Sequence, residues 1–203
     1  MRISPGKKVT LIVILLLVID QIVKFWIKTH MTIGESIPVF GSWFQIYFIE
    51  NNGMAFGMQF GGEFGKLFLT LFRIVLIGAI IYYINKLIRT SAPPGVLVGV
   101  SLILVGAIGN VIDSTFYGLI FSESTYNSVA TLFPPGGGYS SLFHGKVVDM
   151  LYFPLIDTTL PEWVPFRGGE QFIFFRPIFN IADSCITIGV AYLLIFKRSF
   201  FSK

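Results

Sequence analysis

Four long apolar runs constrain this chain more than any other feature of its sequence. Each is close to the length of about 20 residues that an α-helix needs to cross the hydrocarbon core of a bilayer. Only 13% of the 203 residues are charged, which is roughly half of what a soluble domain carries. We therefore expect one all-α membrane domain over residues 1–203, with four transmembrane helices. The predicted spans are residues 9–27, 67–84, 95–112 and 178–196.

Charged residues next to these spans predict their orientation. Basic side chains precede the first span, separate the second from the third and follow the fourth, and these three segments contain no acid. Because basic segments stay in the cytoplasm, both termini should be cytoplasmic and the loops 29–66 and 114–177 should lie outside. The basic residues are scattered singly or in pairs, so we expect no nucleic-acid partner. Those that flank the spans are Arg2, Lys7, Lys8, Lys86, Arg89, Lys197, Arg198 and Lys203.

The first span also has the basic start and apolar stretch of a secretory signal peptide. However, no cleavage site with small residues follows it, whereas Asp20, Gln21 and Lys24 are present. We therefore interpret this span as a retained anchor.

The two outer loops differ in composition. Residues 43–49 are rich in aromatic and β-branched side chains, and Asn51, Asn52 and Gly53 follow as a turn signal, so we expect a small antiparallel sheet on the outer surface. An aromatic belt at the membrane interface is the alternative interpretation. Residues 121–144 are rich in Ser and Thr and contain a Pro-Pro-Gly-Gly-Gly run, which predicts a mobile loop.

Acidic residues at or within the spans are the most informative polar feature. A carboxylate in mid-membrane costs roughly 2.5–3.5 kcal/mol unless it is paired or faces a wet cavity. From the helix rise of about 1.5 Å per residue, Asp20, Asp183 and Asp113 lie roughly 18, 21 and 27 Å above the inner face. They therefore meet in the outer leaflet from three helices. Because polar groups of a bundle face its interior, we expect a shared pocket.

Simpler interpretations exist for several of these residues. Asp20 and Lys24 are spaced i,i+4 and can pair on one helix face. Asn110 and Asp113 can form a polar helix end at the headgroups. Asp183 is harder to explain in this way, because it lies one turn into a span with no basic residue nearby in the sequence.

Three further residue types bear on the chemistry. Arg73 lies seven residues into the second span, where it either snorkels to the outer interface or pairs with an aspartate. Cys185 is interpreted as a small packing residue. His30, His144 and Cys185 share no ligand spacing, so we expect no metal and no cofactor.

Paired carboxylates suggest a reaction class. Two of them in a low-dielectric pocket do not both ionise, so the pair holds one acid and one base. Together they can polarise a carbonyl group and activate a water molecule. Serine chemistry is less favoured, because no Ser has a base at a recognisable spacing, although a Ser–Lys pair stays open.

Five short motifs resemble those of one bacterial family, the lipoprotein signal peptidases or signal peptidases II. They follow the family's order, and the resemblance covers nearly the whole chain, from residue 20 to 189. The motifs are D-x-x-x-K at 20–24, N-x-G-x-A-F at 51–56, G-N-x-x-D at 109–113, G-x-V-V-D at 145–149 and F-N-x-A-D at 179–183.

The resemblance implies an intramembrane aspartic endopeptidase of the bacterial inner membrane. Such an enzyme removes signal peptides from lipid-modified prolipoproteins, cutting before the diacylglyceryl-cysteine near the outer face. Its partners would be prolipoproteins and membrane lipid, and we expect a monomer. By motif, the catalytic residues would be Asp149 and Asp183. Residues that line or brace the substrate site would be Asn51, Gly53, Asn110, Asp113, Asn180 and Ala182, with Asp20 and Lys24 in support.

Two departures from the family pattern stand out. Ser114 follows the G-N-x-x-D aspartate where the family usually has Arg, and Arg167 or Arg176 would be the substitute. Residues 119–144 lie between two motifs that are close together in the family, as expected of an insertion at a loop tip. Two other functions remain open, a proton- or cation-coupled transporter that uses the same aspartates and a non-catalytic membrane scaffold.

Overall fold

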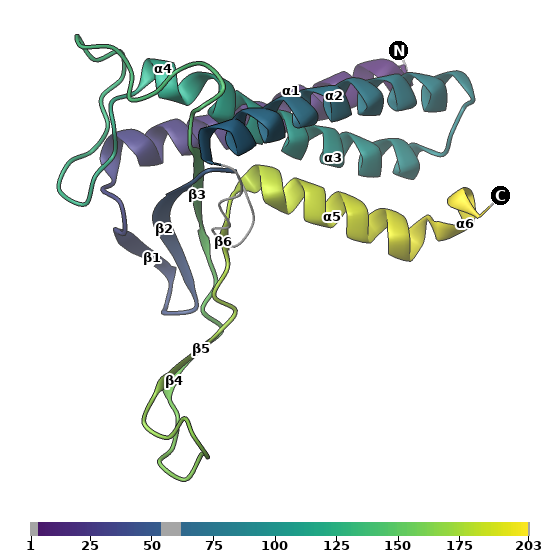
Figure 1. Cartoon of the computed structure of the whole chain (residues 1–203). Helices are drawn as coiled ribbons and strands as arrows, with labels where there is room; N and C mark the ends of the chain where they lie inside the picture. Colours follow the sequence, from purple (N-terminus) through teal and green to yellow (C-terminus); the bar gives the residue numbers. More distant parts are fainter. Residues whose placement is uncertain (1–3, 54–61, 203) are drawn as a thin grey trace.

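A computed structural model describes residues 4–53 and 62–202 of the chain. Arg2 and Lys203, used above for orientation, lie outside the described residues, and so do residues 54–56 of the N-x-G-x-A-F motif. The described part consists of long helices that run side by side, with a small sheet across one end of them (Figure 1).

Four helices form the bundle. Three of the described helices are long and apolar enough to cross a membrane, whereas α5 is a shorter apolar helix. The side chain of Ser4 caps the N-terminus of α1, which has Pro in its first turn. Asn180 caps the N-terminus of α5. The bounds are Pro5–His30 for α1, Gly62–Arg89 for α2, Pro94–Ile112 for α3 and Ile181–Phe196 for α5.

The helix bounds correct the predicted spans at two places. Residues 178–180 are not helical, because Ile178–Phe179 pair with the sheet as strand β6 and Asn180 is the cap of α5. At the end nearer the sheet, α3 continues without a break through a π-helical turn, Asp113–Tyr117, into α4, Gly118–Ile120, so the loop predicted to begin at residue 114 begins after residue 120. A short helix α6, Arg198–Phe201, follows α5.

Helix α3 is the central helix and packs against α1, α2 and α5. Its contact with α5 depends on glycine, because a Cβ on Gly106 would lie 2.3 Å from the backbone oxygen of Ala182. Small residues at such crossings let helix backbones approach closely. One apolar cluster, with Val96 and Leu193, fills the end of the bundle away from the sheet, and a second, with Phe48 and Tyr117, lies beneath the sheet.

An antiparallel sheet confirms the strand prediction for residues 43–49. Its strand order is β1-β2-β3-β6, and the register of β2 with β3 sets Ile49 opposite Asp149. The bounds are Ser36–Phe40 for β1, Phe44–Asn51 for β2 and Val147–Tyr152 for β3. A second pair of strands, β4 (Ile156–Thr159) and β5 (Gln171–Phe174), was not predicted and extends away from the bundle (Figure 1).

The expectation of a mobile loop over residues 121–144 is wrong for a part of that segment. Phe121 and Ala130 are buried in the cluster beneath the sheet. The N–H of Ala130 donates to the carbonyl of Lys28 at 3.1 Å, and the N–H of Tyr139 donates to that of Phe121 at 3.0 Å. The loop is therefore packed onto the end of α1 nearer the sheet, because its few apolar residues reach the core in spite of the polar composition.

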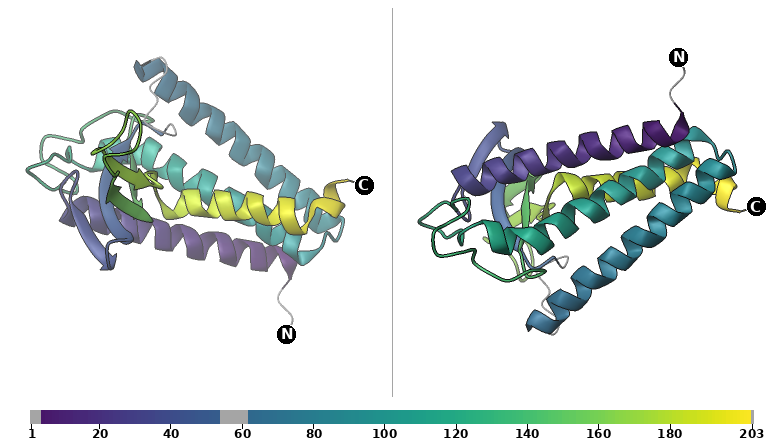
Figure 2. Two further views of the ribbon diagram at one scale, coloured as in Figure 1. Left: turned by 90° about the horizontal axis from the view of Figure 1, so that it is seen from below. Right: turned by 90° about the horizontal axis from the view of Figure 1, so that it is seen from above.

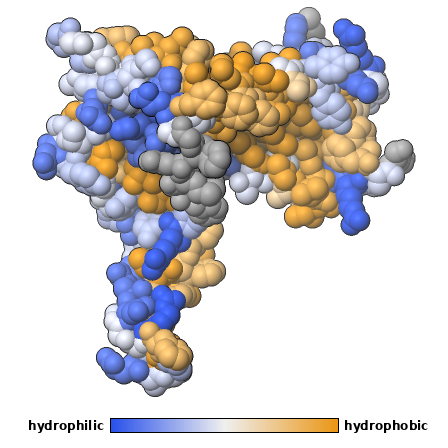
Figure 3. Space-filling view, in the orientation of Figure 1, coloured by the Kyte–Doolittle hydropathy of each residue, from blue (hydrophilic) through white to orange (hydrophobic). Residues whose placement is uncertain are grey.

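Surface hydropathy divides the molecule along the bundle axis. Apolar side chains cover the helices and polar ones gather at the two ends (Figure 3). The first residues of α1 and the last helix, α6, lie at the same end, away from the sheet (Figure 2). The predicted arrangement of apolar helices with a small sheet is thus confirmed at this level.

Candidate active site

Lys24 is the centre of the first polar cluster inside the bundle. Its Nζ lies 3.1 Å from Oδ2 of Asp20 and 2.8 Å from Oδ2 of Asp113. We call Asp20, Lys24 and Asp113 the lysine cluster; none of the three has any exposed surface. The predicted pairing of Asp20 with Lys24 is confirmed. The headgroup interpretation of Asn110 and Asp113 is wrong, because both side chains are buried in the bundle.

Two backbone N–H groups donate hydrogen bonds to the lysine cluster. Asp113 Oδ2 accepts a hydrogen bond from the N–H of Val148 at 3.2 Å, and Asp20 Oδ1 accepts one from the N–H of Ala182 at 3.0 Å. Each of these amides belongs to the residue just before an aspartate of the second group. The cluster therefore fixes the backbone at Asp149 and at Asp183.

Asp149 and Asp183 form the second group, which we call the aspartate pair. Asp149 lies on β3, and Asp183 lies in the first turn of α5. Asn180 connects them, because its Nδ2 donates to Asp149 Oδ1 at 2.7 Å while its Oδ1 accepts from the N–H of Asp183 at 2.8 Å. The pairing of β6 with β3 brings the start of α5 beside Asp149.

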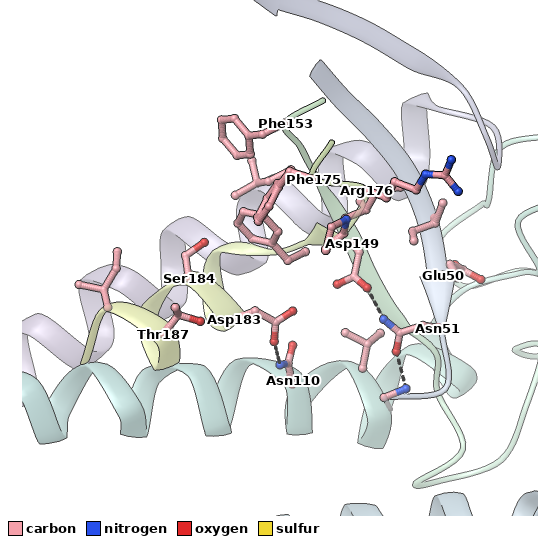
Figure 4. A pocket seen from close by; sticks show the side chains of 18 of the residues that line it. Glu50, Asn51, Asn110, Asp149, Phe153, Phe175, Arg176, Asp183, Ser184 and Thr187 are labelled. Carbon is pink, nitrogen blue, oxygen red and sulfur yellow. Dashed lines mark hydrogen bonds between the residues drawn. The ribbon is translucent and has the colours of Figure 1, made fainter. Parts of the chain in front are cut away.

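Two more asparagines bind the outer sides of the aspartate pair (Figure 4). Asn51 Nδ2 donates to Asp149 Oδ2, and Asn110 Nδ2 donates to Asp183 Oδ1 at 2.7 Å. Asn51 also accepts from the N–H of Gly53, whose φ of +87° is one that glycine adopts without strain. The site predicted from the motifs is therefore assembled from four separate segments of the chain.

Asn110 joins the two groups. Its Oδ1 accepts from Lys24 Nζ at 3.3 Å and from Asn180 Nδ2 at 3.0 Å, while its Nδ2 binds Asp183. Ala182, the last predicted site residue, is fully buried, and its Cβ is the close neighbour that leaves room only for glycine at position 109. Asn110 therefore both lines the cavity and supports the aspartate pair, whereas Ala182 belongs to the support alone.

A cavity of about 1130 Å³ opens over the aspartate pair. Its polar end is formed by the two carboxylates, Asn51 and Asn110, and Figure 4 shows both carboxylates turned toward it. The remaining wall is largely apolar. That wall includes Leu151, Phe153, Phe175, Ile178, Phe179 and Ile188. The arrangement suits a ligand with a long apolar part and one polar bond near the aspartates.

Asp149 is buried, with 2% of its surface exposed. Burial, together with the charge of Asp183, raises the pKa of Asp149 from 3.8 to about 7, against the opposing effects of Lys24 and of the two asparagine hydrogen bonds. A carboxyl group with such a pKa can hold a proton at neutral pH and release it during a reaction.

Of the three arginines considered from the sequence, two line the cavity and one does not. Arg73 lines the cavity and donates through Nη2 to the carbonyl of Gly53 at 2.6 Å, so it neither extends to the membrane surface nor forms one of the ion pairs found among the described residues. Arg176 also lines the cavity. Arg167, by contrast, pairs with Glu170 at 2.9 Å on the extended β4–β5 hairpin and does not reach it.

Two features of the site had no clear signal in the sequence. Lys28 is fully buried and pairs with Glu50, and Ser124 from the 119–144 insertion donates to the same carboxylate at 3.0 Å. Gln21 donates to both Asp20 and Asp113, at 3.1 and 3.0 Å. The sequence indicated these contacts only through the helical spacing of Gln21, Lys24 and Lys28, which places the three side chains along one face of the first span.

No group of three His, Cys, Asp or Glu side chains suited to a metal ion occurs among residues 4–53 and 62–202. Cys185 is buried and not in a disulfide.

Comparisons with known proteins identify the family. Residues 12–199 match the family model for signal peptidase (SPase) II. The lipoprotein signal peptidase of Porphyromonas gingivalis is 54% identical over 96% of this chain and 84% of that protein, and that of Amoebophilus asiaticus is 41% identical over 93% and 76%. A solved bacterial membrane enzyme, 26% identical, covers 96% of this chain and 90% of its own, with a TM-score of 0.63. The resemblance found in the five motifs is confirmed, and the chain belongs to the signal peptidase II family.

Proposed function

We propose that Asp149 and Asp183 are the catalytic residues with which this signal peptidase removes signal peptides from lipid-modified prolipoproteins, cutting before the diacylglyceryl-cysteine. The observation that carries the assignment is the shared Asn180, which binds both aspartates at the polar end of the cavity. Membership in a peptidase family favours this function over a transporter or a scaffold built on the same aspartates.

The mechanism follows from the different surroundings of the two carboxyl groups. Asp149 keeps a proton, since its pKa is about 7, and donates a hydrogen bond to the scissile carbonyl. Asp183 lies at the N-terminus of α5, where the helix dipole favours negative charge, and takes a proton from the attacking water. The tetrahedral intermediate then expels the amine of the new N-terminus, which receives that proton.

The cavity fits a substrate of this kind. Its apolar wall, with Phe153, Phe175 and Phe179, suits the apolar part of a signal peptide and the acyl chains on the cysteine. Arg73 and Arg176 add positive charge at the cavity, and we assign to Arg73 the binding of a substrate carbonyl near the aspartate pair. Asn51, Gly53, Asn110 and Asn180 orient the carboxylates, and the lysine cluster supports them.

The same proposal includes a location. We place α1, α2, α3 and α5 across the bacterial inner membrane, as one domain with both termini in the cytoplasm and the sheet outside. Basic residues at the first turn of α1, the last turn of α2 and the end of α5 support this orientation. A monomer is sufficient, because one chain supplies both carboxylates and all their amide partners.

The direct test is cleavage of a lipid-modified prolipoprotein by the purified protein in detergent. We expect cleavage before the modified cysteine, unchanged by a strong chelator, and no cleavage of the same precursor without its lipid. Ion transport in vesicles without any cleavage would refute the proposal. A reporter inserted near Gly137 should be external and one fused after Lys203 cytoplasmic; the reverse result would overturn the orientation.

A further inference from the structure

A two-stranded arm extends from the outer sheet. It comprises residues 155–175, with β4 and β5 paired along its length, and we call it the arm. Figure 1 shows it running across the direction of the helices and ending far from the bundle. Neither the aspartate pair nor the lysine cluster includes any of its residues, so catalysis alone does not account for it.

The two faces of the arm differ in chemistry. Residues directly opposite each other in an antiparallel pair share one face. Ile156 lies opposite Phe174, and the next pair on that face is Thr158 with Phe172. The other face carries the pairs Asp157 with Ile173 and Thr159 with Gln171, and Gln171 donates to Asp157 at 2.9 Å across the strands. One face is therefore mainly apolar and the other mainly polar.

Large apolar side chains on the arm are exposed to a degree that is unusual at an aqueous surface. Ile156 and Phe174 are about half exposed, and at the tip Trp163 and Phe166 are 80% and 103% exposed. Figure 3 shows the part of the arm near the sheet with apolar side chains on the side that faces the helices. Its opposite side is polar. Large apolar side chains gathered on one side of the arm indicate a surface that is covered in use.

The position of the arm determines what covers it. β3 leads into the arm, and β6 and the cap of α5 follow it, so its base lies at the outer end of α5. The arm runs perpendicular to the helices in Figure 1 and is seen nearly end-on in the two views of Figure 2. With the helices across a membrane, the arm is parallel to the membrane plane, at the level of the outer headgroups.

We propose that the arm lies on the outer leaflet, with the face of Ile156 and Phe174 toward the lipid and with Trp163 and Phe166 in the interface. Tryptophan is the residue that membrane interfaces favour, because its ring is apolar and its N–H stays hydrated. Polar Asp157 and Gln171 then face water. The proposal rests on the membrane orientation given above and not on the assignment of the catalytic residues.

Lipid contact would also set the level of the cavity. Phe153, two residues before the arm, and Phe175, its last residue, line the cavity wall. An arm fixed on the outer leaflet therefore holds this wall at the depth where the lipid-bearing cysteine of a substrate lies. A second copy of the chain or a soluble protein could in principle cover the same surface, and the test separates these occupants.

Tryptophan fluorescence in vesicles tests the proposal. Trp26→Phe and Trp43→Phe together leave Trp163 as the sole tryptophan of the chain. In phosphatidylcholine vesicles with bromine near the headgroups, Trp163 should lose most of its emission, and aqueous iodide should have little effect. The matched control adds Trp163→Phe and Tyr126→Trp to these two changes, so that its sole tryptophan is at position 126. Tyr126 is 77% exposed on the 121–144 loop, and that position should show the opposite quenching.

Each outcome decides the proposal. Quenching of Trp163 by iodide to the same extent as in the control, with no effect of brominated lipid, would overturn it. Protection from both quenchers that appears only at high protein-to-lipid ratio would assign the surface to a second copy and would overturn it too. Thermal melting of the same samples reports folding, and prolipoprotein cleavage reports function. Absent cleavage with strong bromine quenching would sink the proposed function while leaving the arm assignment intact.

Discussion

The lysine cluster and the aspartate pair use the same residue type for opposite purposes. In the lysine cluster, two buried aspartates flank one ammonium group, at 3.1 and 2.8 Å. In the aspartate pair, each carboxylate accepts from asparagine amides and no cation lies within ion-pair distance among the described residues. The first arrangement pairs both carboxyl groups with one cation inside the bundle, and the second leaves its carboxyl groups without a cation partner.

That difference separates support from chemistry. Removing one partner of a buried ion pair is costly, because it leaves an uncompensated charge in a low-dielectric interior. Amides orient a carboxylate without fixing its charge, so Asp149 can exchange a proton near neutral pH. The two groups are nevertheless one structure, because Asn110 contacts Lys24 on one side and Asp183 on the other.

Removing the charge of the aspartate pair should have the largest effect. Asp149→Asn and Asp183→Asn keep the shape of the side chain but remove the titrating group and one acceptor oxygen, so each should lower kcat by at least about 10³-fold. The double variant should be little worse than either single one, because the two act as a unit. Thermal melting in detergent should show that all three variants fold.

Asp20→Asn is the matched control for this experiment, since it changes an aspartate of the lysine cluster. It should retain more activity than either variant of the aspartate pair. If Asp149→Asn kept near-normal turnover, the pair would be wrongly assigned and Asp113 would be the next partner to test with Asp183.

Breaking the lysine cluster should affect stability more than chemistry. Lys24→Met leaves two buried carboxylates facing each other, which is expected to cost about 3–5 kcal/mol of unfolding free energy. Lys7→Met, at an exposed position on the same helix, should cost almost nothing. Adding Asp20→Asn and Asp113→Asn to Lys24→Met should recover a part of the loss in a thermal melt. Equal melting of Lys24→Met and the parent protein would contradict the support role.

Hydropathy and spacing predicted much of the fold. The apolar runs fell within the helices because a span must bury its backbone in a continuous helix. The start of the fourth span was missed because Ile178 and Phe179 are as apolar in a strand as in a helix. Asp149 and Asp183 are brought together by the pairing of β6 with β3, a long-range contact that no local pattern reports, and only the motifs indicated it.

Composition predicted the structure wrongly where a few residues decide the packing. Residues 121–144 have the Ser, Thr and Gly content of a mobile loop, yet Phe121 and Ala130 attach it to the core. Arg73 lies in an apolar run, and periodicity does not tell whether such a side chain turns toward lipid or into a cavity. The β4–β5 arm was hidden by its two short strands, of four residues each, which lie between turn residues and lack a long alternation.

The proton on Asp149 should appear as a pH dependence of stability. Its pKa rises from 3.8 to about 7 on folding, so the folded protein binds this proton more tightly than the unfolded chain. The contribution of Asp149 is therefore favourable below pH 3.8 and is lost as the pH rises to about 7, by up to about 1.4 kcal/mol for each pH unit. Asp149→Asn should remove this slope and be relatively more stable at alkaline pH. Parallel melting curves of the two proteins across this range would contradict the raised pKa.

Removing the hydroxyl of Ser124, which contacts the Lys28–Glu50 pair, should have the smallest effect on stability. Lys28 and Glu50 repeat the lysine–carboxylate pairing with a single carboxylate, and the hydroxyl of Ser124 lies 2.8 Å from Lys28 Nζ and 3.0 Å from Glu50 Oε1. Ser124→Ala removes the hydroxyl but leaves the ion pair, so it should cost about 1 kcal/mol of stability. It should leave kcat unchanged, because Lys28 continues to hold Glu50 and hence the end of β2 that carries Asn51. The matched control is Asn127→Ala, at an exposed position of the same loop, which should stay within about 0.5 kcal/mol of the parent protein. If both variants melted like the parent, the loop would not be docked at Ser124, and its composition would have been the better guide.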